Sequence, residues 1–345
     1  MRPVTFLKLD KWWASHYGTM LAFIYAVTAA SPSPPAPAVL LATLGIFTVA
    51  TLGIGTFGQL LNDLTDVEQD VRTGARNILA TRGVPSRVTL MALVLVVGIV
   101  PWRWLPTTPA VAALVGLEYA LLIAYSVPPL RLKERGFAGL LADALYAYAV
   151  PNAFAMLLFT NLGGGTPRVA MLTAILAWCL CFGIERILFH QLLDVTADRR
   201  GGVRTFVVRQ GWDRAFGIAL RVVVPAMVVS FLAMLGAWAT ISPVVPACFF
   251  VHALLAAWSV RGLRAGTPAT PLTPIAVYHL VAERLVGTFV WRWLGPAALA
   301  TLVVKRPQYL PLVPIHLALF PEPVVWLWRQ AIPAAVGRLR SVLRA

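Results

Sequence analysis

Apolar stretches of about 20 residues recur along the chain, and short polar or proline-rich segments separate them. A helix needs roughly 20 apolar residues to cross a hydrocarbon core about 30 Å thick, and a helix satisfies its own backbone hydrogen bonds there. The pattern therefore predicts membrane-spanning helices. Their approximate ranges are 16–31, 38–61, 88–105, 109–126, 137–160, 169–193, 215–240 and 243–260.

The end of the chain is harder to divide into spans. Residues 274–304 are longer than one untilted span requires and contain charged side chains, and residues 308–328 are apolar but contain several prolines. We expect about nine transmembrane helices, with 308–328 forming either a tenth span or an interfacial helix. The chain then divides into an interfacial segment at 1–15, a transmembrane domain at 16–304, and a C-terminal apolar segment with a basic tail at 305–345.

Composition agrees with this division. Of the 345 residues, 59% are hydrophobic and 12% are charged, whereas a soluble domain has about 25% charged residues. The fold class that we predict is an all-α polytopic membrane protein. No short apolar stretch with a small-residue cleavage site follows Met1, so we expect the first apolar stretch to remain as a span.

The net charge of +15 could indicate a nucleic-acid partner, but the basic residues gather in alternate loops. Four arginines follow the second span, three basic residues follow the fourth, and three arginines follow the sixth. Positive charge of this kind marks cytoplasmic loops. We therefore expect an integral membrane protein in contact with the lipid bilayer, with a cytoplasmic N-terminus and no nucleic-acid partner.

The densest negative charge lies at the end of the second span, where residues 63–70 contain four acidic side chains. On a helix Asp63, Asp66 and Asp70 lie at i, i+3 and i+7, so their carboxylates share one face, and Asn62 lies one turn before Asp66. Like charges at this spacing destabilise a helix unless a cation neutralises them. Oxygen ligands of this kind suit Mg2+ bound together with substrate phosphates.

A second acidic cluster follows the sixth span. Asp194 and Asp198 lie at i and i+4 on a helical continuation of that span, and the predicted topology places them on the same side as the first cluster. If the two clusters face each other, they can hold two Mg2+ ions bridged by an anionic diphosphate. The diphosphate would be bound by the amide of Asn62 and by the cations near the clusters. These cations are Arg72, Arg131, Lys133, Arg199 and Arg204. The alternative interpretation is that these acids are solvated loop residues.

The two motifs, NDxxDxxxD at Asn62–Asp70 and DxxxD at Asp194–Asp198, resemble those of the UbiA superfamily of intramembrane prenyltransferases. The segment YSxPPxRLKxRG at 125–136 resembles the loop after the fourth span in the chlorophyll-synthase and homogentisate-prenyltransferase branches. The resemblance covers roughly residues 15–304. It implies nine helices around a central cavity and Mg2+-dependent transfer of a polyprenyl group from an isoprenoid diphosphate to an acceptor.

Such a reaction passes through an allylic carbocation, which a dry cavity protects from water. The aromatic face of Tyr125 could stabilise this cation, as could Tyr119, Tyr146, Tyr148 and Phe154. His190 and Gln191, about one turn before Asp194, are candidates for a base or for binding the acceptor, although a histidine satisfied by local contacts is an equal alternative. Polar residues within the spans should face the cavity or each other. They are Glu118, Asp143, Asn152 and the pair Glu185–Arg186.

Other functions share some of these features. A terpene cyclase of the same superfamily would use the same diphosphate site without a separate acceptor, and a phosphoribosyl acceptor would need extra basic residues at the mouth. A cation transporter would instead carry its acids near the middle of the membrane, whereas these clusters lie at the ends of spans. The sequence thus favours a prenyltransferase, with the cyclase as the main alternative.

Overall fold

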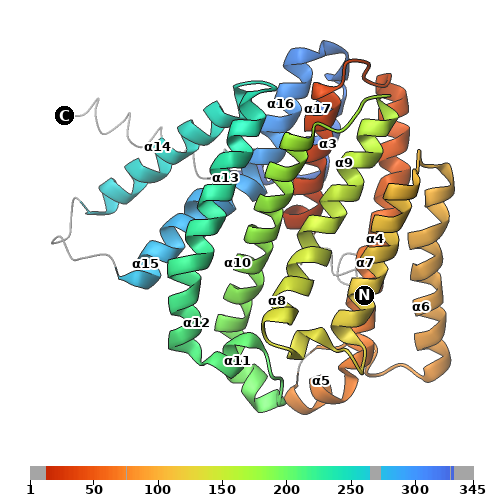
Figure 1. Cartoon of the computed structure of the whole chain (residues 1–345), viewed down its shortest axis with the longest axis vertical. Helices are drawn as coiled ribbons and strands as arrows, with labels where there is room; N and C mark the ends of the chain where they lie inside the picture. The colour runs from red at the N-terminus through yellow and green to blue at the C-terminus, as the bar shows by residue number, and fades with distance from the viewer. Residues whose placement is uncertain (1–12, 75, 265–272, 327, 330–345) are drawn as a thin grey trace.

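The computed structural model describes residues 13–74, 76–264, 273–326 and 328–329, and the regular structure within these ranges is helical (Figure 1). Seven helices in these ranges are long and apolar enough to cross a membrane. They are α4 (Pro37–Thr65), Val84–Trp104 with α6 (Val84–Ile99), α7 (Pro109–Ser126), Phe137–Leu162 with α8 (Phe137–Ala144) and α9 (Val150–Leu162), α10 (Val169–Gly201), Trp212–Ala239 with α12 (Trp212–Ile218) and α13 (Val224–Ala239), and Pro274–Lys305 with α15 (Pro274–Tyr278) and α16 (Gly295–Lys305).

The first and eighth expected spans correspond to shorter apolar helices. Helix α3 (Gly18–Ala30) follows a single π-helical turn at Trp13–Tyr17, and α14 (Val244–Arg264) is apolar over Val244–Trp258. Each of the nine apolar stretches predicted up to residue 304 therefore forms a helix, and seven of these meet the length and hydropathy expected of a span. The protein is an integral membrane protein with an all-helical fold.

The apolar stretch 308–328 does not form one continuous helix. It contains α17 (Leu312–Leu319) and α18 (Glu322–Trp326), which have eight and five residues. At 1.5 Å per residue neither can cross a core about 30 Å thick. Within the described residues this stretch is thus not a tenth span. Most of the expected N-terminal segment (1–12) and of the basic tail (330–345) lies outside the described residues.

Three of the long helices contain a π-helical turn that ends two positions before a proline. These turns, Leu145–Ala149, Ala219–Val223 and Phe289–Leu294, precede Pro151, Pro225 and Pro296. A proline inside a helix lacks a backbone N–H and clashes with the carbonyl four residues earlier. A wider turn at this point accommodates the proline, so each helix continues as one span.

Close packing of α4 against α6 depends on two glycines. A Cβ atom built on Gly53 would lie 2.3 Å from the backbone nitrogen of Gly98. Any side chain at Gly53 would therefore push the two helices apart. Elsewhere along α4, aromatic side chains pack against α9, with the Phe47 and Phe159 ring centroids 5.4 Å apart.

The helices that carry the two acidic clusters end at the same end of the bundle. Helix α4 leads into α5 (Val67–Thr73), and Figure 1 shows α5 beside the last turns of α10 and α11 (Phe206–Gln210). A Cβ atom built on Gly201 would lie 3.1 Å from Nε2 of Gln69, so α5 and the end of α10 are in contact. This arrangement agrees with the predicted topology of the two clusters.

The C-terminal segment starts at the opposite end and packs against α3. Nη2 of Arg306 donates to the carbonyl of Ser31 at 3.3 Å, which places the end of α16 beside the loop that follows α3. Helix α17 then runs along α3, where Nδ1 of His316 lies 3.3 Å from the hydroxyl of Tyr25. The ring of Phe320, just after α17, stacks on Trp13 with centroids 5.6 Å apart.

Candidate active site

Asp66 lies at the junction between α4 and α5. Its backbone N–H donates to the carbonyl of Asn62 at 3.1 Å, and it closes α4 as the C-cap residue. The chain changes direction here because Asp66 leaves helical geometry (φ −109°, ψ 6°) before α5 begins at Val67. The side chains of Asn62 and Asp66 are thereby directed toward the loop between α7 and α8.

Two cations of that loop bind Asp66. Nζ of Lys133 lies 2.7 and 2.5 Å from the two carboxylate oxygens of Asp66 and 2.8 Å from Oδ1 of Asn62. Nη2 of Arg131 lies 2.9 Å from Oδ1 of Asp66, and Nε of Arg131 lies 2.5 Å from Glu134. Three side-chain oxygens from the first motif thus converge on one ammonium group.

The backbone of the loop holds these cations in place. Lys133 lies in a short 3-10 helix, Leu132–Glu134, whose backbone packs on α8 so closely that a Cβ atom on Gly139 would lie 2.6 Å from the carbonyl oxygen of Leu132. Lys133 is 9% exposed. This burial lowers the pKa of the Lys133 ammonium below its ordinary value, although Asp66 beside it acts in the opposite direction.

The other acids of the first cluster are held from the connection after α5. Nδ2 of Asn77 donates to the backbone carbonyl of Asp63 at 2.6 Å and to Oδ2 of Asp70 at 2.8 Å. Asp63 is 3% exposed. One amide side chain therefore joins the end of α4 to the end of α5 and fixes Asp70 relative to Asp63.

The second cluster is more open to solvent. Oδ2 of Asp194 lies 2.8 Å from Nδ1 of His190, one turn earlier on α10. Oδ2 of Asp198 accepts a hydrogen bond from the hydroxyl of Thr205 at 3.1 Å. Thr205 also caps α11, so the turn between α10 and α11 is tied to the carboxylate of Asp198.

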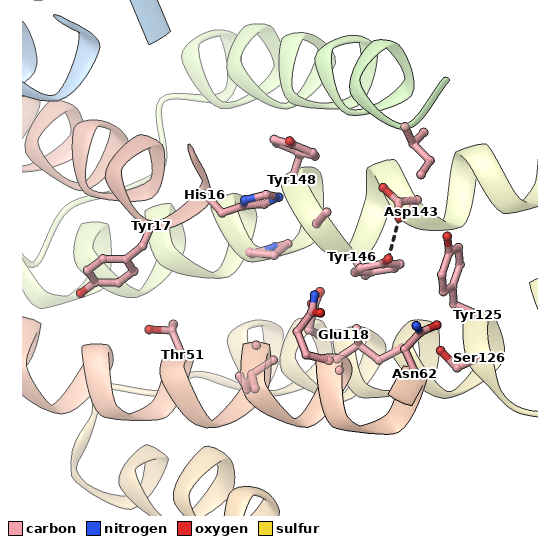
Figure 2. Close-up of a pocket in the computed structure, with 18 of the residues that line it drawn as sticks. His16, Tyr17, Thr51, Asn62, Glu118, Tyr125, Ser126, Asp143, Tyr146 and Tyr148 are labelled. Carbon is pink, nitrogen blue, oxygen red and sulfur yellow. Dashed lines mark hydrogen bonds between the residues drawn. The ribbon is translucent and has the colours of Figure 1, made fainter. Parts of the chain in front are cut away.

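A cavity of about 780 Å³ lies inside the bundle beside the first cluster. Asn62 and Thr51 both line it, eleven residues apart on one face of α4, which at 1.5 Å per residue is a depth of about 16 Å. Figure 2 shows Asn62, Ser126 and Tyr125 near one end of the cavity and Tyr17 and Thr51 near the other. The cavity is therefore deep enough to hold an extended apolar chain.

Several polar side chains within the spans line this cavity, as the sequence predicts. The hydroxyl of Tyr146 donates to Oδ2 of Asp143 at 2.6 Å, and the ring of Tyr146 lies edge-on to that of Tyr125 with centroids 5.0 Å apart (Figure 2). Glu118 and Arg186 also line the cavity. Asn152 differs, since it is buried and donates to the backbone carbonyl of Tyr148 at 2.6 Å.

Not every candidate residue lies at the mouth of the cavity. Arg72 is exposed, and its Nε donates to the carbonyl of Glu68 in its own helix at 3.2 Å. Gln191 is buried against α11, where its Oε1 lies 3.4 Å from the backbone nitrogen of Val207. Arg199 and Arg204 are exposed near the end of α10. Of the two acceptor candidates, His190 lines the cavity and Gln191 does not.

The sequence interpretation did not single out three residues that line the cavity. Arg76 lies in the connection after α5, while His16 and Tyr17 lie where α3 begins. The ring centroids of His16 and Tyr148 lie 4.6 Å apart, so the residues just before α3 contact the π-helical turn that joins α8 to α9. The only signals in the sequence were a basic loop and two polar residues at the edge of an apolar stretch.

The donor chemistry of the first cluster suits a hard divalent cation, since its donors are carboxylate and amide oxygens. The convergence of Asn62 and Asp66 on the ammonium of Lys133 demonstrates that these oxygens can surround one positive centre. No three His, Cys, Asp or Glu side chains gather around one point in the part of the chain that the structure describes. The carboxylates instead have protein partners in this structure. Asp66 binds Lys133, Asp70 binds Asn77, and Asp194 binds His190.

Comparison with known proteins identifies the fold. A UbiA homolog from Archaeoglobus fulgidus bound to DMAPP and Mg2+ aligns with a TM-score of 0.53 and 12% identity, over 87% of this chain and 99% of that chain. The same homolog bound to GPP and Mg2+ also gives 0.53 and 12%, over 89% and 98%, and bound to Cd2+ it gives 0.50 and 14%, over 89% and 98%. At such identities the likeness shows the fold alone.

By sequence, no curated protein matches the chain. The model of the UbiA prenyltransferase family, however, matches residues 18–282, which is well over half of the 345 residues. This range includes both acidic motifs and the loop with Arg131 and Lys133. The chain therefore belongs to the UbiA prenyltransferase family.

Proposed function

We propose that this protein is a Mg2+-dependent intramembrane prenyltransferase, which moves a prenyl group from an isoprenoid diphosphate to an acceptor and releases diphosphate. The observation that carries the proposal is the convergence of Asn62, Asp66 and Lys133 at the edge of a deep cavity inside the bundle. Family membership supports it, as do the fold neighbours described as bound to DMAPP or GPP with Mg2+.

In this proposal both acidic clusters hold Mg2+, with two ions in all. Asn62, Asp63, Asp66 and Asp70 would serve on one side, and Asp194 and Asp198 on the other. The metal, when bound, would neutralise part of the negative charge on the diphosphate and so make it a better leaving group. The contact between Gln69 in α5 and Gly201 at the end of α10 supports this arrangement, because it brings the two helix ends together.

The cations of the loop between α7 and α8 would bind the diphosphate. Lys133 and Arg131 neutralise Asp66 in this structure, and an incoming diphosphate offers them stronger anionic partners. Both cations then stabilise the leaving group as it acquires charge. Arg76, which lines the cavity from the connection after α5, is a further candidate for this role.

The cavity would receive the prenyl chain and protect the carbocation from water. The rings of Tyr125 and Tyr146 lie near its polar end, where the bond to the diphosphate would break, and their faces can stabilise positive charge (Figure 2). The arginine-rich loops on this side of the bundle support a cytoplasmic mouth under the positive-inside rule.

The test uses the purified full-length protein with geranyl diphosphate and Mg2+, and measures saturable binding and diphosphate release. We expect Asp66→Asn combined with Asp198→Asn to reduce diphosphate release at least 100-fold. Asp213→Asn is the matched control, because Asp213 is an exposed acid in the first turn of α12 at the same end of the bundle. A fully active double variant would contradict the proposed site.

The same assay separates the transferase from the cyclase. Mass spectrometry of products formed from labelled geranyl diphosphate without an added acceptor would reveal a cyclic hydrocarbon or alcohol if the protein is a cyclase. A transferase should instead give a prenylated product that depends on the acceptor.

A further inference from the structure

Glu118 is a buried acid in the wall of the cavity. It is 3% exposed and lines the cavity from α7, seven residues before Tyr125. Seven residues are about two helical turns, so Glu118 and Tyr125 lie on the same face of α7, about 10 Å apart along its axis. Figure 2 shows Glu118 between the end marked by Asn62 and the end marked by Tyr17.

One oxygen of this carboxyl lacks a partner. Among the described residues no hydrogen-bond donor reaches Oε2 of Glu118. Buried polar groups in proteins are nearly always hydrogen-bonded, and an unpartnered one at the wall of a cavity is suited to a ligand. Because a carboxyl oxygen accepts hydrogen bonds, the complementary group is a donor such as a hydroxyl or an N–H.

Two other charged side chains of the cavity, Arg186 and Asp143, already have partners. Arg186 is bound by Glu185, with Nε 2.8 Å from Oε2, and also by Glu283. Its positive charge is therefore already neutralised by two carboxylates. Asp143 accepts a hydrogen bond from the hydroxyl of Tyr146. Arg76, in the connection after α5, also lines the cavity and is assigned to the diphosphate in the proposed function. Around Glu118 itself the cavity thus offers an acidic oxygen, and the cation Arg186 is already paired, which disfavours a carboxylate ligand there.

We propose that Glu118 binds the acceptor by accepting a hydrogen bond from its hydroxyl or N–H group, and that the acceptor carries no carboxylate of its own. This inference rests on the proposed function, because the acceptor must lie between the diphosphate and Glu118. The distance of about 10 Å between Tyr125 and Glu118 along α7 leaves room there for a small ring.

The test compares matched pairs of acceptor probes with the purified full-length protein, geranyl diphosphate and Mg2+. The pairs are 4-hydroxybenzyl alcohol against 4-hydroxybenzoate, and 1-naphthol against 1-naphthoate. Prenylated product is measured by mass spectrometry. We expect the uncharged member of at least one pair to be used with a kcat/KM at least 10-fold higher than its acid.

Two substitutions at Glu118 make the role of its oxygen measurable. Glu118→Leu should raise the KM for the uncharged probe at least 10-fold, while Glu118→Gln, which keeps an acceptor oxygen, should stay within about 3-fold. Asp213→Asn is the control, since Asp213 is an exposed acid on α12 and does not line the cavity. The Kd for geranyl diphosphate should not change in any variant.

Three outcomes would overturn the inference while the proposed function stands. They are equal or better use of the carboxylate probes, an unchanged KM in Glu118→Leu, and no use of any uncharged probe by a protein that binds geranyl diphosphate with Mg2+. If the wild-type protein shows no saturable binding of geranyl diphosphate, the proposed function itself fails, and the inference fails with it.

Discussion

Lys133 and Asp66 form an ion pair between two segments that lie far apart in the sequence. The ammonium of Lys133 contacts both carboxylate oxygens of Asp66, and the closer contact is 2.5 Å. Arg131 contacts only one of these oxygens and shares its charge with Glu134. The two cations of the loop are therefore not equivalent, and Lys133 has the more direct contact with the first motif.

The first prediction follows from this difference. Lys133→Met should lower kcat/KM for the isoprenoid diphosphate about 100-fold, which corresponds to about 2.7 kcal/mol of lost transition-state stabilisation, and Arg131→Met about 10-fold. Lys305→Met is the control, because Nζ of Lys305 contacts the carbonyl of Ile241 on another part of the bundle. Steady-state kinetics of diphosphate release check the result. Equal effects of all three substitutions would contradict a role for this loop.

The second prediction concerns metal removal. Chelation of divalent ions should abolish turnover, and added Mg2+ should restore it. The melting temperature should change little, because Lys133 and Arg131 still neutralise Asp66 without metal. Activity and thermal unfolding, measured on the same sample with and without EDTA, test both statements. Turnover that persists in EDTA would remove the argument for metal-assisted ionisation.

The third prediction addresses the crossing of α4 and α6. Gly53→Ala should destabilise the protein by about 1–3 kcal/mol, because the added Cβ atom would lie 2.3 Å from the backbone of Gly98. Gly45→Ala is a matched control on the same helix, since its Cβ atom would meet nothing within 4 Å. Thermal unfolding in detergent compares the two variants. A melting temperature lowered equally in both would argue against this close contact.

The fourth prediction concerns the charges around Arg186. Arg186→Met should lower stability by about 3–5 kcal/mol, because Glu185 and Glu283 would lose their cation inside the bundle. Adding Glu185→Gln and Glu283→Gln should recover part of this loss. Arg221→Met, at an exposed position of a neighbouring helix, should have a smaller effect. Melting temperatures of the four proteins test the network, and no recovery in the triple variant would contradict it.

Helix positions were predictable because the lengths of apolar stretches reflect the thickness of a bilayer. The expected span 109–126 coincides with α7, which begins after the capping residue Thr108. The sixth span was expected to end near 193 and to continue as a helix through Asp194 and Asp198, and α10 indeed continues to Gly201. Hydropathy reports where a helix leaves the apolar core, and the polar residues after it remain compatible with helical structure.

The partners of the acidic residues were not predictable from spacing. The i, i+3 and i+7 pattern predicted one shared helix face for Asp63, Asp66 and Asp70, but α4 ends at Thr65 and α5 begins at Val67, so the three residues do not lie on one continuous helix. The pattern also did not predict the pairing of Asp66 with Lys133 or of Asp70 with Asn77. These contacts depend on how loops fold back over helix ends. The π-helical turns and the entry of His16 into the cavity likewise result from tertiary packing.

The inner end of the cavity is built from both ends of the chain. Tyr17, which lines that end, is hydrogen-bonded to Thr48 of α4 and lies against the ring of Phe320, with centroids 6.5 Å apart. The floor on which a prenyl tail would rest is thus supported by residues that follow the last long helix. Shortening the protein after Lys305 would therefore remove the contact of Phe320 with Tyr17 and so alter which prenyl tail lengths the inner end of the cavity can accommodate.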